Sequence, residues 1–297
     1  MVAASVTGMR FGFVVPFTDP QEFTELAALG ERHGWDGIFT WESLWGTEAW
    51  VTLGAASMVT SRIRLGTLLT PASRHRPWDL ASRVGTVDRL SRGRAIMSVG
   101  LGALHEGWTA FEADEGRRVR AEKLDEVLAV YAGLFHGQPF TFEGRHHSAR
   151  PTEFMLPAPP VHQPHPPVWV VGAHVVGAGR QRSLERAARW DGILPSVVDE
   201  AAREGAPPYD LDSYAEVLRI VRQVREEAGL PWDSYDRVVE ADSSREFVQL
   251  EGTPADWAQA GATWWVESWW GVPSDAAGVA EVRRRIAAGP PGSASGA

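Results

Sequence analysis

The stretch "ERHGWDGIFTW", Glu31–Trp41, reads as the end of a helix, a tight Trp-Asp-Gly turn and an apolar strand. The stretch "ERAARWDGILPS", Glu185–Ser196, repeats the same three features in the same order. The two stretches contain the second and sixth of the eight strands that the sequence predicts. A repeat four strand–helix units apart is expected of two half-barrels, so it modestly favours a closed barrel.

Short apolar runs alternate with amphipathic helical patterns such as Asp19–Gly34, Glu48–Thr60 and Arg76–Ser91. Strands separated by helices of this length predict βαβ units and a parallel sheet. Eight such units predict an α/β fold built as a single (β/α)₈ TIM barrel. The predicted strands are Arg10–Pro16, Asp36–Trp41, Arg62–Thr70, Arg94–Gly100, Pro167–Gly172, Asp191–Ser196, Arg237–Ala241 and Ala262–Ser268.

One long segment interrupts the alternation. Residues 137–169, "GQPFTFEGRHHSARPTEFMLPAPPVHQPHPPVW", begin like a hairpin around Glu143-Gly144 and continue as a proline-rich extended run. We expect an insertion between strands 4 and 5 that is either functional or seals the lower end of the barrel. The barrel domain is expected to span residues 9–288, with residues 1–8 and 289–297 as disordered tails.

Composition excludes several classes of function. The formal net charge of −9 and the absence of a basic cluster argue against nucleic-acid binding. No apolar run approaches the roughly 20 residues that span a bilayer, and residues 1–8 lack a signal-peptide pattern, so we expect a cytoplasmic protein. The chain has no cysteine, which excludes thiol chemistry, and its one lysine, Lys123, lies in a charged helix, which disfavours a Schiff base or a P-loop.

Six motifs occur in a fixed order over roughly Met9–Ala288: "GWDGIFTWES", "SRIRLGTLLTPASRHRPWDLAS", "DRLSRGRAIMSVGLG", "RVRAEKLDEVLAVYAGLFHGQPFTFEGRHHS", "PPVHQPHPPVWVVG" and "RAARWDGILPS". With these motifs the chain resembles the bacterial luciferase-like monooxygenase superfamily of flavin- and deazaflavin-dependent oxidoreductases. The resemblance implies a flavin ring that lies across the barrel mouth, held by the ends of strands three to five.

The resemblance also implies where the cofactor binds. Family members often carry a non-proline cis peptide at the end of the third strand, and the matching position is Leu68–Leu69. Glycines at the fourth strand end would let the ring approach the backbone. The stretch "GAHVVGAGRQRS" after the fifth strand is either the cofactor's phosphate site or a flexible loop with solvated arginines. The expected cofactor-binding residues are Leu68, Leu69, Thr70, Gly100, Gly102, Gly172, Ala173, His174, Gly179 and Arg180.

The catalytic candidates are Glu42, His75 and His105. Deazaflavin-dependent dehydrogenases of the family often have Asp-His after the second strand, whereas this chain has Glu42-Ser43, which weakens an alcohol-dehydrogenase interpretation. Glu42 is either a desolvated acid or base or the cap of the next helix. His75 or His105 is expected to hydrogen-bond the cofactor or the substrate. A metal site of His75, His105 and His174 is not expected, because "VVP" replaces the His-x-His pair of metal-dependent barrel hydrolases at the first strand.

The stretch "GATWWVESWWG", Gly261–Gly271, contains four tryptophans. Strand alternation predicts that Trp264 and Trp265 point to opposite faces and pack the core. The second pair follows the strand, and we expect it to line a substrate pocket that excludes water. The predicted pocket tryptophans are Trp41, Trp45, Trp108, Trp269 and Trp270.

The resemblance implies a monooxygenase that uses reduced FMN on a hydrophobic organic substrate, which is the favoured interpretation. The alternative is the same barrel with the deazaflavin coenzyme F420, which transfers hydride. A non-catalytic flavin-binding protein and a metal-dependent hydrolase are further alternatives. The resemblance implies a homodimer and, with FMN, a flavin reductase partner; the small-molecule substrate stays open.

Overall fold

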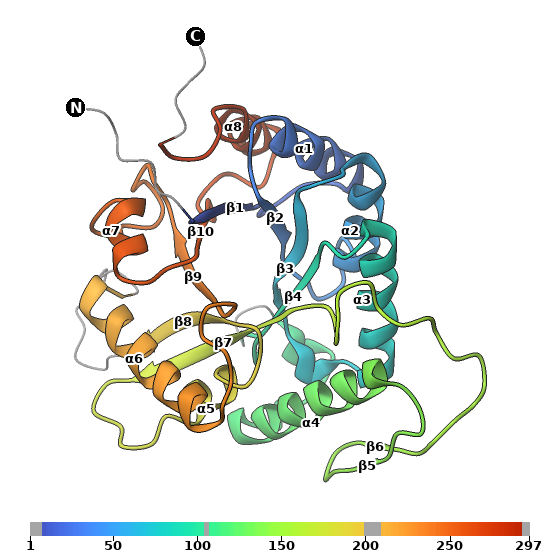
Figure 1. Cartoon of the computed structure of the whole chain (residues 1–297). Helices are drawn as coiled ribbons and strands as arrows, with labels where there is room; N and C mark the ends of the chain where they lie inside the picture. Colours follow the sequence, from blue (N-terminus) through green and yellow to red (C-terminus); the bar gives the residue numbers. More distant parts are fainter. Residues whose placement is uncertain (1–7, 104–106, 199–208, 293–297) are drawn as a thin grey trace.

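The computed structural model describes residues 8–103, 107–198 and 209–292. Eight parallel strands form a closed barrel in the order β1-β10-β9-β8-β7-β4-β3-β2, with helices around it (Figure 1). This confirms the predicted (β/α)₈ fold, and each predicted strand lies within three residues of an observed one. The barrel strands are β1 (Arg10–Val14), β2 (Gly37–Thr40), β3 (Arg64–Thr70), β4 (Ala95–Val99), β7 (Val168–Val175), β8 (Gly192–Val198), β9 (Asp236–Ala241) and β10 (Trp264–Ser268).

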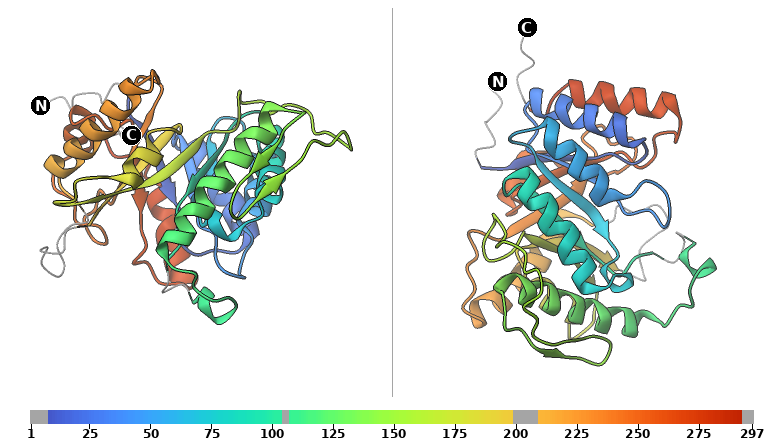
Figure 2. Two further views of the ribbon diagram at one scale, coloured as in Figure 1. Left: turned by 90° about the horizontal axis from the view of Figure 1, so that it is seen from below. Right: turned by 90° about the vertical axis from the view of Figure 1, so that its right-hand side faces the viewer.

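The helices follow the strands around the outside of the barrel (Figures 1 and 2). Among the described residues, no helix combines the length and the apolar character needed to cross a membrane. The predicted tails are only partly described, since residues 1–7 and 293–297 lie outside the described ranges. The helices are α1 (Pro20–Arg32), α2 (Ala49–Val59), α3 (Pro77–Ser91), α4 (Arg117–His136), α5 (Arg182–Ala187), α6 (Leu211–Glu227), α7 (Pro254–Gln259) and α8 (Ala276–Ala287).

The two repeated Trp-Asp-Gly stretches make the same contacts. The Asp36 carboxylate accepts the N–H of Phe11 at 2.8 Å, and the Asp36 N–H donates to the Phe11 carbonyl at 2.7 Å. The Asp191 carboxylate accepts the N–H of Val168 at 2.8 Å, and the Asp191 N–H donates to the Val168 carbonyl at 3.0 Å. Each aspartate therefore hydrogen-bonds backbone groups near the start of the preceding barrel strand. The two repeated stretches, four units apart, thus have the same structural role.

Three aromatic rings fill the barrel interior. The ring centroids of Phe39, Trp169 and Trp264 lie 5.2–6.1 Å apart. Gly37 leaves room for them, because a Cβ there would come within 2.9 Å of both Phe39 and Trp264. Trp265 points outward into the layer between strands and helices, so the prediction that this pair splits between two faces is confirmed.

The predicted insertion is present between β4 and β7. After α4 the chain forms a two-stranded antiparallel hairpin, β5 (Phe142–Glu143) and β6 (Ser148–Ala149), outside the ring of helices (Figures 1 and 2). The extended run that follows is attached to α3, because the N–H of Val161 donates to the Asp88 carboxylate at 2.7 Å.

Candidate functional site

A pocket of about 730 Å³ opens at the carboxyl ends of the strands, where (β/α)₈ enzymes place their reactive groups. We call it the mouth pocket. Its walls are mostly apolar, and none of its lining residues comes from the insertion. The lining residues are Phe17, Trp41, Leu44, Leu68, Leu69, Val171, Leu194, Pro195, Ser196, Val197, Tyr209, Glu240, Val248 and Trp270.

The end of β3 forms one wall of the mouth pocket. The Leu68–Leu69 peptide is cis, as the resemblance implied, and the β3–β4 pairing shifts register between Thr67 and Thr70. Both leucines line the pocket, whereas Thr70 is buried and its hydroxyl donates to Glu42 at 3.0 Å. Leu68 and Leu69 therefore line the pocket, whereas Thr70 supports the Glu42 carboxylate.

The predicted glycines allow close packing at this rim. A Cβ at Gly100 would lie 3.0 Å from Leu69 and 3.3 Å from Val171, both of which line the mouth pocket. Gly102 has φ +73°, where an L side chain is strained, and Gly172 packs against Ile193. Their contact with a cofactor stays a prediction.

The structure brings two of the three catalytic candidates together. One Glu42 oxygen accepts hydrogen bonds from Trp50 Nε1 at 2.7 Å and from Thr70, and the other lies 2.7 Å from His75 Nε2. Glu42 does not cap the next helix, because Glu48 does so by accepting the N–H of Val51. Neither Glu42 nor His75 lines the mouth pocket, and His105 lies outside the described residues.

Two of the five predicted pocket tryptophans line the mouth pocket. Trp41 and Trp270 meet edge to face with ring centroids 6.5 Å apart. The prediction for Trp269 is wrong: it is 3% exposed and packs outside the barrel against Phe13 and Trp35. Strand alternation continues past the end of β10, so Trp269 points outward and Trp270 inward.

The other two tryptophans also lie elsewhere. Trp45 is 84% exposed on the loop before α2, which carries it away from the mouth pocket. Trp108 is buried, donates to the Ala103 carbonyl at 3.1 Å and packs near the guanidinium groups of Arg74 and Arg120. Both were predicted from their place after a strand, which does not fix the direction of a side chain on a long loop.

Glu240 lines the mouth pocket but is not among the predicted site residues. Its Oε1 accepts the N–H of Trp270 Nε1 at 2.7 Å, and its backbone N–H donates to the Tyr209 hydroxyl at 3.0 Å. Burial raises the pKa of Tyr209, so its hydroxyl stays protonated. The signal was available: alternation in β9 places Val238 and Glu240 inside the barrel, and a charged residue at an inward position indicates a function.

An arginine-lined hollow, which we call the arginine recess, lies beyond the end of β7. Ser183, which borders it, accepts the N–H of Ala173 at 2.9 Å and donates to the carbonyl of Val171, a residue of the mouth pocket. The two hollows are therefore neighbours. The recess is lined by Leu101, Arg117, Arg118, Ala121, Glu122, Asp125, Arg180, Arg182, Ser183, Glu185, Arg186 and Arg189.

Positive charge exceeds negative charge in the arginine recess. Arg118, Arg180 and Arg186 each pair with one of its three carboxylates. Within the described ranges, Arg117, Arg182 and Arg189 form no ion pair, so their charge is available to an anion. The predicted phosphate residue Arg180 lies here but pairs with Glu185, whereas His174 and Gly179 border an adjacent hollow.

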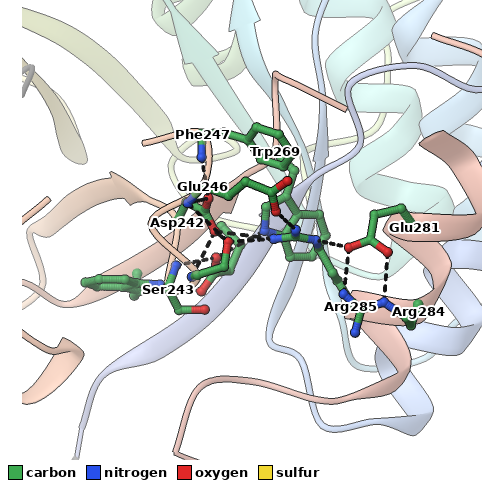
Figure 3. Close-up of polar contacts among 11 residues, drawn as sticks. Asp242, Ser243, Glu246, Phe247, Trp269, Glu281, Arg284 and Arg285 are labelled. Atoms are coloured by element: carbon green, nitrogen blue, oxygen red, sulfur yellow. Dashed lines mark hydrogen bonds and ion pairs between the residues drawn. The ribbon is translucent and has the colours of Figure 1, made fainter. Parts of the chain in front are cut away.

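A polar cluster fixes the strand ends that carry Glu240 and Trp270. Arg285 of α8 lies between Glu281 on one side and Asp242 and Glu246 on the other (Figure 3). Asp242 is buried and accepts the N–H groups of Glu246 and Phe247. The loop after β9 is therefore held against α8.

Glu267 of β10 lies on the outer face of the barrel and contacts the loop after β9. It is buried, and it accepts hydrogen bonds from Trp265 Nε1 at 2.9 Å, Trp269 Nε1 at 3.2 Å and the Ser243 N–H at 3.0 Å. Burial raises the pKa of Glu267. Neither here nor in any other described part of the chain is a group of three or more acidic or histidine side chains arranged to hold a metal ion.

Comparison with known proteins identifies the family. Residues 9–263 match the family model described as luciferase-like monooxygenase. An uncharacterised protein of Mycobacterium tuberculosis is 32% identical over 236 residues, covering 77% of this chain and 71% of the relative. An F420-dependent glucose-6-phosphate dehydrogenase of Nakamurella multipartita is 28% identical over 236 residues, covering 70% and 67%.

The fold is shared with solved structures. The coenzyme F420 dependent tetrahydromethanopterin reductase from Methanopyrus kandleri superposes with a TM-score of 0.72 at 16% identity, covering 95% of this chain and 97% of that one. Together with the match over residues 9–263, these findings confirm the resemblance, and the chain belongs to the luciferase-like monooxygenase family.

Proposed function

We propose that this luciferase-like oxidoreductase binds coenzyme F420 at the mouth pocket and transfers hydride to or from a small apolar substrate. The observation that carries the proposal is an apolar, tryptophan-lined pocket directly beside a recess with surplus arginines. A flat, largely apolar ring with an anionic tail is complementary to that pair of hollows. The sequence alone favoured FMN, but relatives of this chain are named F420-dependent, and this favours the deazaflavin.

The residues present fit such a cofactor. Leu68 and Leu69 offer an apolar wall for the ring, and Gly100 beside them carries no side chain that would narrow the approach. Arg117 and Arg182 are placed to bind the anionic tail. When bound, the deazaflavin supplies the hydride chemistry, and the protein's part is to bind, orient and exclude water.

The substrate is proposed to be small and not phosphorylated. Relatives of this chain carry the name glucose-6-phosphate dehydrogenase, but no lysine, arginine or histidine is among the described lining residues of the mouth pocket. A phosphate placed there would lose its hydration without a cation to replace it. The homodimer implied by the resemblance is part of the proposal.

Titration of the purified protein with coenzyme F420 and with FMN tests the proposal. Trp41 and Trp270 line the pocket, so a bound ring should quench part of the tryptophan fluorescence. We expect coenzyme F420 to bind at least tenfold more tightly than FMN. Tighter binding of FMN, with oxygen consumption by the reduced complex, would instead support the monooxygenase; binding of neither would refute both.

A further inference from the structure

Glu240 is the one carboxylate among the described residues that line the mouth pocket. The remaining lining side chains are apolar, apart from Ser196 and Tyr209. A carboxylate among mostly apolar neighbours gives up part of its hydration, and a ligand that donates a hydrogen bond can compensate for this loss. This placement raises the question of what Glu240 binds.

The position of Glu240 is fixed from two sides. Its backbone N–H donates to the Tyr209 hydroxyl at 3.0 Å, and that hydroxyl also lies 3.3 Å from the Glu240 carbonyl oxygen. Its carboxylate Oε1 accepts Trp270 Nε1 at 2.7 Å. Across the described ranges nothing donates a hydrogen bond to Oε2, so one oxygen is held in place with its acceptor capacity unused.

The surroundings of Glu240 add rigidity. Asp242, two residues beyond it, and Trp269, next to Trp270, both belong to the polar cluster around Arg285 (Figure 3). The Arg285 side chain is 10% exposed and bonds Ser244 Oγ at 2.8 Å. Supporting contacts of this kind hold a binding group in one geometry and lower the entropic cost of using it.

We propose that Glu240 determines substrate specificity: Oε2 accepts a hydrogen bond from a hydroxyl or ammonium group on an otherwise apolar substrate, and its charge excludes carboxylates and phosphates. The inference rests on the proposed function, because the substrate shares the mouth pocket with the cofactor. Like charges at close range repel each other, and the repulsion is stronger in a pocket that is partly removed from water. A site with a fixed polar group also discriminates sharply between ligands that satisfy it and ligands that do not.

Three probes with the same ring test this assignment: cyclohexylamine, cyclohexanol and cyclohexanecarboxylate. Their affinities are measured by calorimetry at neutral pH on protein loaded with coenzyme F420. We expect the amine to bind at least tenfold more tightly than the carboxylate, with the alcohol between them. In Glu240→Gln the preference for amine over carboxylate should fall at least tenfold.

Glu251→Gln is the matched control. Glu251 lies on the segment that follows β9, is exposed and does not line the pocket, so its loss of one negative charge should leave the preference unchanged. Glu240→Asp, whose carboxylate is set back by one methylene, should give an intermediate preference. This variant replaces Glu240→Gln in the test if the glutamine variant does not fold. An unchanged preference in both Glu240 variants, or an equal loss in Glu251→Gln, would overturn the assignment. Loss of cofactor binding in the unaltered protein would instead refute the proposed function.

Discussion

Glu42 and Glu240 are two carboxylates near the barrel mouth, and each accepts a hydrogen bond from a tryptophan N–H at 2.7 Å. They differ at the second oxygen. In Glu42 the second oxygen faces His75, and Thr70 adds a further donor at the first oxygen. In Glu240, which lines the pocket, Oε2 has no hydrogen bond from the described residues. Location near a strand end therefore does not distinguish the two carboxylates, whereas the number of hydrogen bonds that each accepts does.

The largest expected effect concerns stability. Glu42→Ala leaves Trp50 Nε1 and His75 without this partner and removes one of the two acceptors of the Thr70 hydroxyl, in a region where Glu42 itself is 9% exposed. We expect the free energy of unfolding to fall by about 3 kcal/mol, measured by urea denaturation. Glu240→Ala, the matched variant, should lose less than about 1.5 kcal/mol, because it frees one donor only. If both variants unfold equally easily, the distinction between the two carboxylates fails.

The next effect concerns the cofactor. Arg182→Ala removes an arginine without an ion pair among the described residues and should weaken coenzyme F420 binding about tenfold, equivalent to about 1.4 kcal/mol. Arg180→Ala should weaken it less, because Arg180 is already paired with Glu185. Added salt should reduce both differences. The measurement is a fluorescence titration at two salt concentrations, and equal effects of the two variants would contradict the comparison.

The third effect concerns the hydrogen bond from Trp270 to Glu240. Trp270→Phe keeps an aromatic ring and deletes the N–H, so cyclohexylamine should bind about fivefold more weakly, equivalent to about 1 kcal/mol. Trp269→Phe also deletes an indole N–H, but its partner Glu267 lies outside the barrel. That variant should lower stability without changing the affinity, and a change of affinity there would show that the two faces of β10 are coupled.

The smallest expected effect concerns Glu31, a carboxylate that does not line the mouth pocket. Burial alone would raise the pKa of Glu31, but the N–H groups of Ile63, Arg62 and Ser61 lower it from 4.5 to about 2. Because the folded pKa lies below the unfolded one, Glu31 stabilises the fold above about pH 4.5, and this contribution is lost as the pH falls toward 2. In Glu31→Gln the free energy of unfolding should therefore fall less steeply as the pH is lowered from 4.5 toward 2, with unchanged ligand affinity. An identical acid transition in both proteins would refute this.

The fold could be predicted from periodicity, because eight strands with helices between them allow few architectures. The repeated Trp-Asp-Gly turn was informative for a physical reason: Asp36 and Asp191 satisfy the same backbone groups. The positions at which the strands end were predicted less accurately. Strand β7 extends to Val175 and strand β8 to Val198, beyond the predicted ends at Gly172 and Ser196.

The site could be predicted in part. The family resemblance located the Leu68–Leu69 wall, and Trp41 and Trp270 followed from their place at the strand ends. Trp269 was misplaced because alternation was not continued beyond Ser268. Tyr209 and Val248 could not have been found, since they reach the mouth pocket from loops whose course depends on tertiary contacts.

A crystal structure of the protein with coenzyme F420 tests the central claim most directly. The account predicts that the ring lies in the mouth pocket against Leu68 and Leu69, with the anionic tail in the arginine recess and Glu240 Oε2 open to a substrate. A ring bound elsewhere, or a tail directed away from Arg117 and Arg182, would contradict it.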